Sequence, residues 1–554
     1  MKAAAALLIV LCTFGTVFAQ SLPLPPAEYP MAGSGSGGAR GPISPLSPRS
    51  SHGITVAPAP LVFPSRPAAL TPAALEVSSS TADFNEANLS QLASPMAENS
   101  INSSFTTFAT IDVNGATDGT NILTADGTGN IDVYNLTGSL LSSCSQYSLL
   151  VCPTVCNSQG QCGAGQAVDT RAIYDLGSQR WVLSALCAFQ PSNTTVQDVV
   201  GVSTSSNPIG CTSASWHVYN FPACGSFDNW DGSDQPHVGF NNQWLAVTSA
   251  CSENSTTHQN GTSLAVFDKN NLYNGGSLTL NSNWFEFVDP YNGGPYNGYT
   301  VVGARDNPVL TYTSTISNRL YLTAALVNAS HDVAITYSHV QGSTDSPVFY
   351  SNTEKVTTTL TATGAQGEEI PSVSNPGCTG CMVSFSNGWI HSSGVWAFTN
   401  GTPYILSTVV FGEPGYSNAT EILGMATNTS TGTSTSLSLK GGTNGSGPMA
   451  SEIAMPAQLS GTDEALIVYA HSNTSFYPGV KAALWNIDSN SISYIDILAE
   501  GVLSPNNGDQ NRWLDFISAI TPIPGASSLE LAARVATPST YDPQGAVYWA
   551  NITP

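Results

Sequence analysis

One short pattern returns along most of this sequence. A polar start, an apolar strand, a turn and a second apolar strand carrying an aromatic residue run from Asp169 to Trp181 and again from Asp234 to Trp244. A third copy starts at Asp306. Self-similarity of this kind indicates an array of small sheets, because one repeat alone cannot bury its own apolar face. The pattern therefore constrains the architecture much more than the activity.

From about residue 105 onward, short alternating apolar runs are bounded by Gly, Asn, Asp and Ser, with almost no helical periodicity. Their opening strands align, roughly 55 to 80 residues apart, near Ile111, Asp169, Asp234, Asp306, Ile370, Ser451 and Arg512. Four-stranded units repeated about six to eight times are typical of β-propellers, in which radial closure leaves only short edges. The sequence predicts an all-β fold, a single β-propeller of seven four-stranded blades. A β-helix would have shorter repeats, and two stacked sandwiches would not repeat at this spacing.

A closed ring requires the last strand to pair with the first unit. We expect residues 545–549 to pair with strands between residues 107 and 134. Such pairing would remove the two free sheet edges that an open array leaves.

The first residues have the features of a secretory signal peptide, namely Lys2, an apolar run and a small-residue cleavage site ending at Ala19. No later apolar run reaches the ~20 residues of a membrane span. We therefore expect a signal peptide over 1–19, a disordered leader rich in Pro, Ala, Ser and Gly over 20–98, and the propeller over 99–554. The protein is expected to be secreted, either extracellular or at the cell surface.

Charged residues make up only 9% of the chain, and the formal net charge is -23. A surface of this sign repels phosphate backbones, so nucleic acid is excluded as a partner. About a dozen Asn-X-Ser/Thr sequons, such as those at Asn135 and Asn473, could accept glycans. A chain rich in Asn, Ser and Thr also produces such triplets by chance.

Cys12 lies in the predicted signal peptide, which leaves ten of the eleven cysteines: Cys144, Cys152, Cys156, Cys162, Cys187, Cys211, Cys224, Cys251, Cys378 and Cys381. An even number in an exported chain favours structural disulfides. The Cys378-Thr-Gly-Cys381 segment resembles a metal or redox knuckle, but zinc would need a second pair or nearby histidines. No metal site is predicted.

Several motifs occur in the order found in exported bacterial-type β-propeller proteins, most of which have no assigned activity. They are Ile131 to Leu141, Asp169 to Trp181, Val202 to Gly210 with Trp216 and Tyr219, Asp234 to Gly239, and Arg512 to Ser518. The chain resembles this family from about residue 105 to 554, which implies a propeller fold. Leu514 stands where the family usually has Gly, and Thr170 where it usually has Pro.

The first strand of a propeller blade lines the central channel, so polar residues there could converge on a ligand. The candidate ligand-binding residues are Arg171, Arg305, Arg512, Asp169, Asp234, His237, Asp306 and Asp515. Three arginines at one channel mouth would resemble the carboxylate clamp of sialidase-type propellers, but the Asp-box of that family is absent. The alternative is structural: such residues also cap turns and pair between blades.

No catalytic nucleophile motif and no pair of metal-binding histidines occur. The sequence favours a non-catalytic binding or structural protein that uses a propeller face for glycan or protein contacts. The alternative is an exported carbohydrate-active hydrolase or lyase with carboxylates above the channel, and the fold alone cannot decide. No cofactor is expected. Residues 228–234 leave open a weak Ca²⁺ site without the full ligand spacing of an EF-hand.

Overall fold

The computed structural model describes residues 42–43, 82–85, 98–101, 113–279 and 299–552, the last two ranges with internal gaps. Nearly all of the regular structure in these ranges is β-strand. The two helices among the described residues are short, α1 (Gln146–Leu149) and α2 (Lys269–Tyr273). None of the described helices is long and apolar enough to cross a membrane. The predicted all-β class is confirmed.

The first unit is a four-stranded antiparallel meander. Its strands are β4 (Val113–Thr117), β5 (Asn121–Asp126), β6 (Asn130–Asn135) and β7 (Leu140–Ser145). The β4–β5 turn forms around Asp118, whose Oδ1 accepts hydrogen bonds from the backbone N–H groups of Thr120 (2.8 Å) and Asn121 (2.7 Å). An aspartate that satisfies backbone donors in this way stabilises a tight turn.

The second and third units lie in one larger sheet. The strands are β10 (Gln166–Asp175), β11 (Arg180–Phe189), β12 (Thr194–Ser203) and β13 (Trp216–Pro222), then β14 (Trp230–Phe240), β15 (Trp244–Glu253) and β16 (Gly261–Asp268). A single parallel pairing of Thr195 with Gly232 joins the two units. Trp181 and Trp244, the aromatic residues of the repeated pattern, are both fully buried.

The later units repeat the meander. They comprise β18 (Tyr299–Thr300), β19 (Leu320–Val327), β20 (Asp332–Ser343) and β21 (Ser346–Thr361); β24 (Ser392–Thr399), β25 (Thr402–Gly412), β26 (Thr420–Asn428) and β27 (Ser434–Lys440); and β28 (Gly447–Ala454), β29 (Glu464–Ser472), β30 (Gly479–Asn486) and β31 (Ser491–Ile495). The last described sheet contains β33 (Ser518–Ile520), β34 (Leu529–Thr537) and β35 (Gln544–Ile552). Shorter strands are β8 (Thr154–Cys156) with β9 (Cys162–Ala164), and β22 (Val373–Ser374) with β23 (Met382–Phe385) and β32 (Arg512–Leu514).

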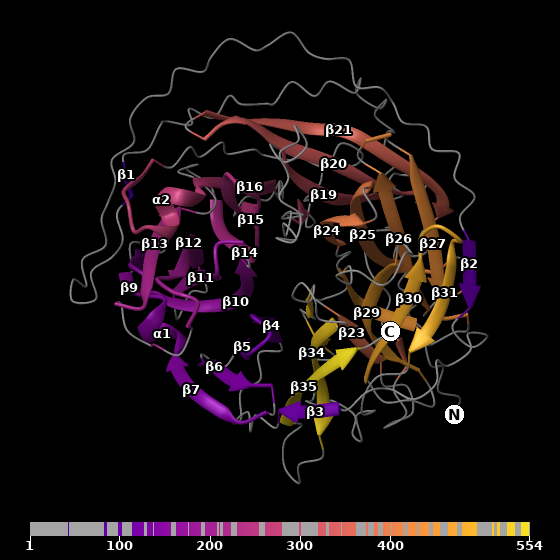
Figure 1. The fold of residues 1–554 in the computed structure, drawn as a ribbon, viewed down its shortest axis with the longest axis horizontal. Helices are drawn as coiled ribbons and strands as arrows, with labels where there is room; N and C mark the ends of the chain where they lie inside the picture. The colour runs from indigo at the N-terminus through magenta and orange to yellow at the C-terminus, as the bar shows by residue number, and fades with distance from the viewer. Residues whose placement is uncertain are drawn as a thin grey trace, which may run out of the picture.

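The first strands of the meanders contact one another in order around a common axis. β4 contacts β10, β10 contacts β14, β18 lies between β15 and β24, and the circuit continues through β28 and β33 back to β4. Figure 1 shows the sheets arranged radially around this axis. The fold is a β-propeller. The number of seven blades stays a prediction, since segments such as 280–298, 301–318 and 496–511 lie outside the described residues.

A strand from the beginning of the chain completes the last sheet. β3 (Glu98–Ile101) pairs antiparallel with β35, with Asn99 opposite Trp549. Residues 547–549 do pair with a strand from the early part of the chain, but the predicted partner between residues 107 and 134 is wrong, because β3 precedes that range. The first unit cannot supply that partner, because β4 to β7 already form a complete sheet of their own.

Two further strands near the beginning of the chain lie on the outside of the ring. β2 (Ala82–Asn85) runs parallel to the outer strand β27, and β1 (Pro42–Ile43) pairs with β17 (Leu278–Thr279). Both fall within the range 20–98. Most of that range and the whole of 1–19 lie outside the described residues, so the domain boundaries stay a prediction.

Alternate residues of β10 enter two different apolar cores. Ala172 lies in a buried cluster with Leu123 and other residues of the first unit, whereas Ile173 lies in a cluster with Leu245 and Phe267 of the third unit. Successive side chains of a strand point to opposite faces. A first strand therefore seals its blade against both neighbours, and its side chains lie between blades.

Candidate functional site

The first strands of the second and third units change register at polar residues that the sequence analysis singled out. Pairing of β10 with β11 shifts between Val168 and Arg171, and Asp169 has a φ of 51°, in the left-handed region. On β14 the shift lies between Asp234 and His237. Such bulges re-aim side chains and recur beside functional sites. The two units thus share an irregularity at the start of the repeated pattern.

Arg171 is buried, with 6% of its surface exposed. Pairing of β10 is regular after the shift, so Arg171 shares a face with Ile173 and Asp175. Ile173 packs against the third unit. The face that carries Arg171 therefore lies against the neighbouring blade. Asp169 and His237 are partly exposed.

The other predicted site residues are described in less detail. Asp234 pairs with Ala250 on β15, and Arg512 pairs with Ser384 on β23, but only their backbones are described. Arg305, Asp306 and Asp515 lie outside the described residues. A grouping of the eight residues at one channel mouth stays a prediction.

A buried ion pair joins the second and third units. Lys269 Nζ lies 3.0 Å from Asp175 Oδ2, and both residues are almost fully buried. The ammonium also faces two aromatic rings, 5.1 Å from the centroid of Phe240 and 5.7 Å from that of Tyr273. Cation–π attraction and a carboxylate together compensate the loss of hydration around a buried ammonium.

Local structure places both partners of this pair. Asp175 ends β10, and its Oδ1 accepts a hydrogen bond from Ser178 N (3.0 Å) in the β10–β11 turn. Lys269 begins α2, which Asp268 caps by accepting hydrogen bonds from Asn270 N (2.9 Å) and Asn271 N (3.2 Å). The ion pair therefore connects a turn of one blade with a capped helix of the next.

Burial and nearby carboxylates raise the pKa values of two tyrosines at this end of the blades. Burial, and then the Asp175 carboxylate, raise the pKa of Tyr273 well above its usual range. Burial, followed by Asp118 and Asp175, raises the pKa of Tyr174 to about 12. Both phenols stay protonated at neutral pH, so neither supplies a phenolate base there.

A second buried carboxylate joins the same two units. Asp198 on β12 accepts a hydrogen bond from the Ser249 hydroxyl on β15, and both residues are 1% exposed. Between the first and second units, Asn114 Oδ1 accepts a hydrogen bond from Ala172 N at 2.6 Å. These buried polar groups thus hold neighbouring blades together.

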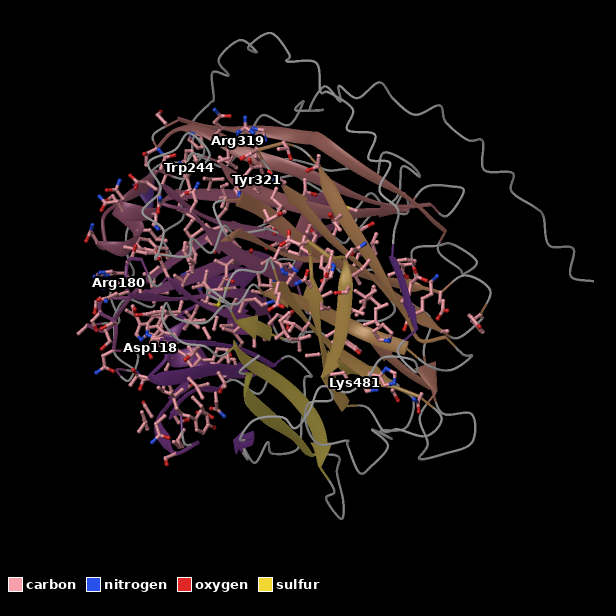
Figure 2. All side chains as sticks on the ribbon, turned by 45° about the vertical axis from the view of Figure 1, so that its right-hand side comes forward. Asp118, Arg180, Trp244, Arg319, Tyr321 and Lys481 are labelled. Carbon is pink, nitrogen blue, oxygen red and sulfur yellow. A yellow bond between two sulfur atoms is a disulfide. The ribbon has the colours of Figure 1, made fainter. Side chains whose placement is uncertain are left out.

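Partly exposed polar residues lie at the rim of the first two units. Figure 2 shows Asp118 and Arg180 on the same side of the molecule, and both influence the Tyr174 phenol. Arg180 Nη1 donates hydrogen bonds to the carbonyl oxygens of Ser178 (3.3 Å) and Gln179 (3.1 Å). Burial, and then the Arg180 charge, lower the pKa of His217. His217 is therefore neutral at physiological pH and adds no positive charge beside Arg180.

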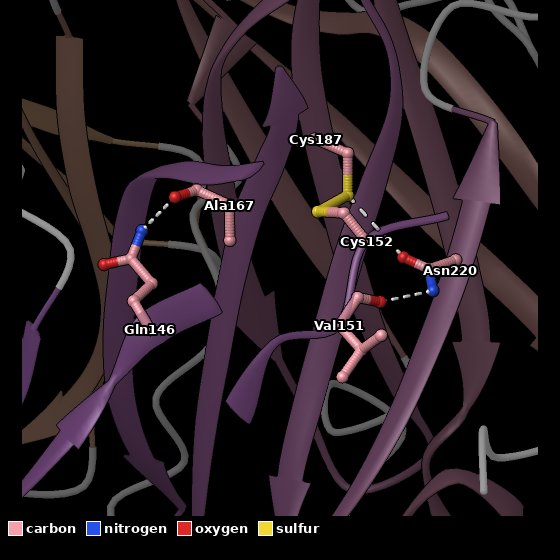
Figure 3. Close-up of a disulfide and its surroundings, with 6 residues drawn as sticks. All are labelled: Gln146, Val151, Cys152, Ala167, Cys187 and Asn220. Carbon is pink, nitrogen blue, oxygen red and sulfur yellow. Dashed lines mark hydrogen bonds between the residues drawn. A yellow bond between two sulfur atoms is a disulfide. The ribbon is translucent and has the colours of Figure 1, made fainter. Parts of the chain in front are cut away.

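A disulfide-bonded segment crosses the second unit. Cys152 and Cys187 form a disulfide with a Cα–Cα distance of 5.5 Å. Gln146 Nε2 donates a hydrogen bond to Ala167 O (2.6 Å), and Asn220 Nδ2 donates one to Val151 O (2.8 Å), as Figure 3 shows. These contacts hold residues 146–152 against β10, β11 and β13.

The apolar residues of this segment fit closely onto the sheet. Leu149 and Leu150 are buried. Leu150 Cδ2 approaches β12 so closely that a Cβ added at Gly201 would lie only 2.8 Å from it. Cys144, which precedes the segment, is also disulfide-bonded. The predicted use of cysteines in structural disulfides is confirmed for these positions, whereas Cys378 and Cys381 lie outside the described residues.

Metal-binding side chains do not gather in the described part of the chain. Within it, no group of three or more His, Cys, Asp or Glu side chains is arranged to hold a metal ion. The side chains of residues 228–234, which left open a calcium site, are not among those described.

Sequence reasoning missed Asp175, Lys269 and Asp198. Asp175 lies inside the repeated pattern, immediately before its turn, and Lys269 is one of only five lysines in the chain. A scarce cation next to an apolar strand is the signal that could have identified the ion pair. No signal in the sequence pairs Asp198 with Ser249, because 51 residues separate them.

No protein-family model and no curated protein matches this sequence. Solved structures similar to the chain include a Trypanosoma rangeli sialidase in complex with sialic acid, at 11% identity and a TM-score of 0.34, covering 72% of this chain and 56% of that one. They also include a Penicillium chrysogenum α-L-arabinanase complexed with arabinobiose (10% identity, TM-score 0.33, 72% of this chain and 100% of that one). A third is the Dos1 propeller (9% identity, TM-score 0.35, 82% and 94%). The chain thus spans little more than half of the sialidase, and likeness at this level assigns no activity to it.

Proposed function

We propose that this chain is an exported β-propeller that binds another macromolecule outside the cell or at its surface, without transforming it. The sequence features of residues 1–19 support export. The Cys152–Cys187 disulfide supports it as well, because disulfides persist in oxidising compartments. Membership of the exported bacterial-type propeller family is part of this proposal.

Exposed apolar side chains on one edge strand and on the helix after it, together called the patch below, carry the proposal. The large apolar side chains that are exposed in the described part of the chain are Leu140 (55%), Leu141 (43%) and Tyr147 (41%). They come from β7, the last strand of its sheet, and from α1 directly after it. Exposed apolar residues on an edge strand are typical of protein-binding surfaces. We therefore favour a protein partner.

The Tyr147 end of the patch lies on a rigid support. Tyr147 belongs to the segment that Gln146, Leu149, Leu150 and the Cys152–Cys187 disulfide hold against the second unit. A preorganised surface loses little conformational entropy on binding, which favours affinity.

A second part of the proposal concerns the channel mouth. If Arg171, Arg305 and Arg512 converge there with Asp169, Asp234, His237, Asp306 and Asp515, the set suits a ligand with carboxylate and hydroxyl groups. Because Arg171 is buried, it could contact such a ligand only in the space between blades. The distances between the three guanidinium groups test this grouping.

The patch can be tested by crosslinking. Tyr147 is replaced by a photoreactive phenylalanine derivative, and the secreted protein is irradiated with the exported proteins of its own organism. We expect one crosslinked partner that is lost in the double variant Leu140→Ser, Leu141→Ser. The same group at exposed Asn242 is the matched control. Equal crosslinking at both positions would remove the support for the patch.

The enzymatic alternative needs its own assay. The same preparation is tested on a panel of chromogenic glycosides and on a glycan array. We expect no turnover. Turnover that disappears when a carboxylate is replaced would favour a glycoside hydrolase, with two carboxyl groups ~5 to 9.5 Å apart in an open pocket. Such a result would overturn the proposal.

A further inference from the structure

Three sequons have an asparagine side chain that the structure describes, at Asn135, Asn428 and Asn473. N-glycosylation joins the glycan to the amide nitrogen Nδ2, so that atom must face solvent in the folded protein. The three sequons can therefore be compared by what each side-chain amide does.

Asn428 uses only its oxygen to hold the chain. It ends β26, and its Oδ1 accepts hydrogen bonds from Ser430 N (2.9 Å) and Thr431 N (3.1 Å) in the turn that leads to β27. The amide is planar, so Nδ2 lies on the side opposite to this turn. Asn428 is partly exposed, and the neighbouring side chains of Ser430, Thr431 and Thr433 are exposed. A glycan on Nδ2 would leave both Oδ1 hydrogen bonds in place.

The Asn473 amide is arranged differently, and Asn135 resembles Asn428 but has contacts in addition to its turn. Asn473 Nδ2 lies 3.3 Å from the Nε2 atom of His471, which is 2% exposed, so this nitrogen faces the interior of the blade. Asn135 Oδ1 accepts a hydrogen bond from Ser139 N (2.8 Å) in the β6–β7 turn, and Asn135 has further contacts besides. Among the three, Asn428 has the geometry that best accommodates a glycan.

We infer that Asn428 is an N-glycosylation site on the rim of the propeller. The inference rests on the proposed export. The reaction transfers an oligosaccharide from a lipid-linked pyrophosphate: the bond between sugar C1 and Nδ2 forms, the bond between C1 and the pyrophosphate oxygen breaks, Nδ2 loses a proton and the lipid pyrophosphate leaves. A glycan there would cover the turn between the third and fourth strands of its sheet.

A matched position without a sequon lies in the next sheet, four strands further along the chain. Asn486 ends β30, and its Oδ1 accepts hydrogen bonds from Ser489 N (2.8 Å) and Ser489 Oγ (2.7 Å) in the β30–β31 turn. Ile487 and the exposed Asp488 follow it, so the triplet lacks the hydroxyl residue. The substitution Asp488→Thr creates a sequon in an equivalent turn.

The test uses the full chain expressed in a eukaryotic secretory host, once with residues 1–19 and once with a host signal peptide in their place. Glycan occupancy is read by mass spectrometry after enzymatic deglycosylation in ¹⁸O water, which marks each formerly modified asparagine. We expect modified Asn428 in the wild-type protein, and its loss in both Asn428→Gln and Ser430→Ala. Asp488→Thr should gain one modified asparagine at Asn486.

The two proposals fail in different ways. If the chain is secreted with the host signal peptide but not with residues 1–19, the proposed export is contradicted. Glycan occupancy of Asn428 can still be measured in the protein that the host signal peptide exports. An unmodified Asn428 peptide from secreted wild-type protein would overturn the inference. If Asp488→Thr carries a glycan on Asn486 while Asn428 is unmodified, a turn of this kind is accessible to the reaction. Asn428 itself is then not used, and the inference is overturned.

Discussion

Two junctions in this propeller are held by different forces. Between the second and third units, the buried Lys269–Asp175 pair and the Asp198–Ser249 hydrogen bond connect the sheets. Between the sheet of β24–β27 and that of β28–β31, the described contacts are close and involve uncharged groups. A Cβ added at Gly424 on β26 would lie 3.2 Å from Ile467 Cδ1 on β29, and the Thr420 hydroxyl donates to Pro448 O.

This difference predicts how the stability of each junction responds to substitution. A buried ion pair loses most when one partner is removed, because the other is left charged and without compensation. A close apolar contact instead loses most when volume is added. The charged junction should therefore be sensitive to deletion, and the uncharged junction to enlargement.

The largest effect is expected for Lys269→Met. It leaves Asp175 buried without its cation and should lower the free energy of unfolding by about 3 to 5 kcal/mol. The double variant with Asp175→Asn should recover most of this loss. Urea unfolding followed by tryptophan fluorescence measures both. Lys481→Met, at a partly exposed lysine, is the control and should change stability by about 0.5 kcal/mol or less. An equal loss in the single and double variants would contradict the role of the pair.

Removing the Cys152–Cys187 disulfide ranks second. The bond closes a loop with a sequence separation of 35 residues, so Cys152→Ser with Cys187→Ser should cost about 2 to 4 kcal/mol. Thermal unfolding of variant and wild type, each with and without reductant, separates this bond from other disulfides. A variant as stable as the oxidised wild type would show that the packing of Leu149 and Leu150 and the hydrogen bonds of the segment fix it without the disulfide.

Gly424→Ala tests the uncharged junction by enlargement. The new methyl group would lie 3.1 Å from Leu437 Cγ and 3.2 Å from Ile467 Cδ1, closer than ordinary contact. We expect a loss of about 1 to 3 kcal/mol. Combining it with Ile467→Val should restore part of the loss, because the space for the methyl group then opens. If the loss of stability in the double variant is the simple sum of the two single losses, the new methyl group does not contact residue 467.

The smallest effect is a pH dependence from Glu413, beside the uncharged junction. Burial raises the pKa of this carboxyl above its usual 4.5, against the opposing influence of its hydrogen bond from Gly442 N. The folded protein therefore binds this proton more tightly than the unfolded chain does. The contribution of Glu413 is fully present below pH 4.5 and is lost as the pH rises through the higher folded pKa. Glu413→Gln should flatten this part of the stability profile, and an unchanged profile would contradict the assignment.

The repeated pattern was enough to predict the architecture. Trp181 and Trp244 mark equivalent buried second strands, and the units expected near Asp169 and Asp234 begin within β10 and β14. Alternation of apolar residues carries this information locally, so it can be read from one sequence.

Which residues contact one another between the blades could not be predicted in the same way. Which face of β10 carries Arg171 depends on the register shift after Val168, and a slip of one residue reverses every side chain beyond it. Lys269, the partner of Asp175, is 94 residues away on a short helix. The pattern of apolar residues in strands does not indicate such a pair. Contacts between blades depend on how distant segments meet, and the spacing of apolar residues does not record that.

The pairing of β3 with β35 ties the order of synthesis to the order of folding. The paired residues Glu98 and Ala550 lie near opposite ends of the described chain. A chain emerging from a ribosome or a translocation pore makes β3 early and cannot close the ring until its last strand is free. Contacts of such long range slow folding, and the incomplete ring exposes unpaired strand edges while it waits. A helper protein that shields those edges during synthesis would therefore act on the open ring, before the two ends of the chain meet.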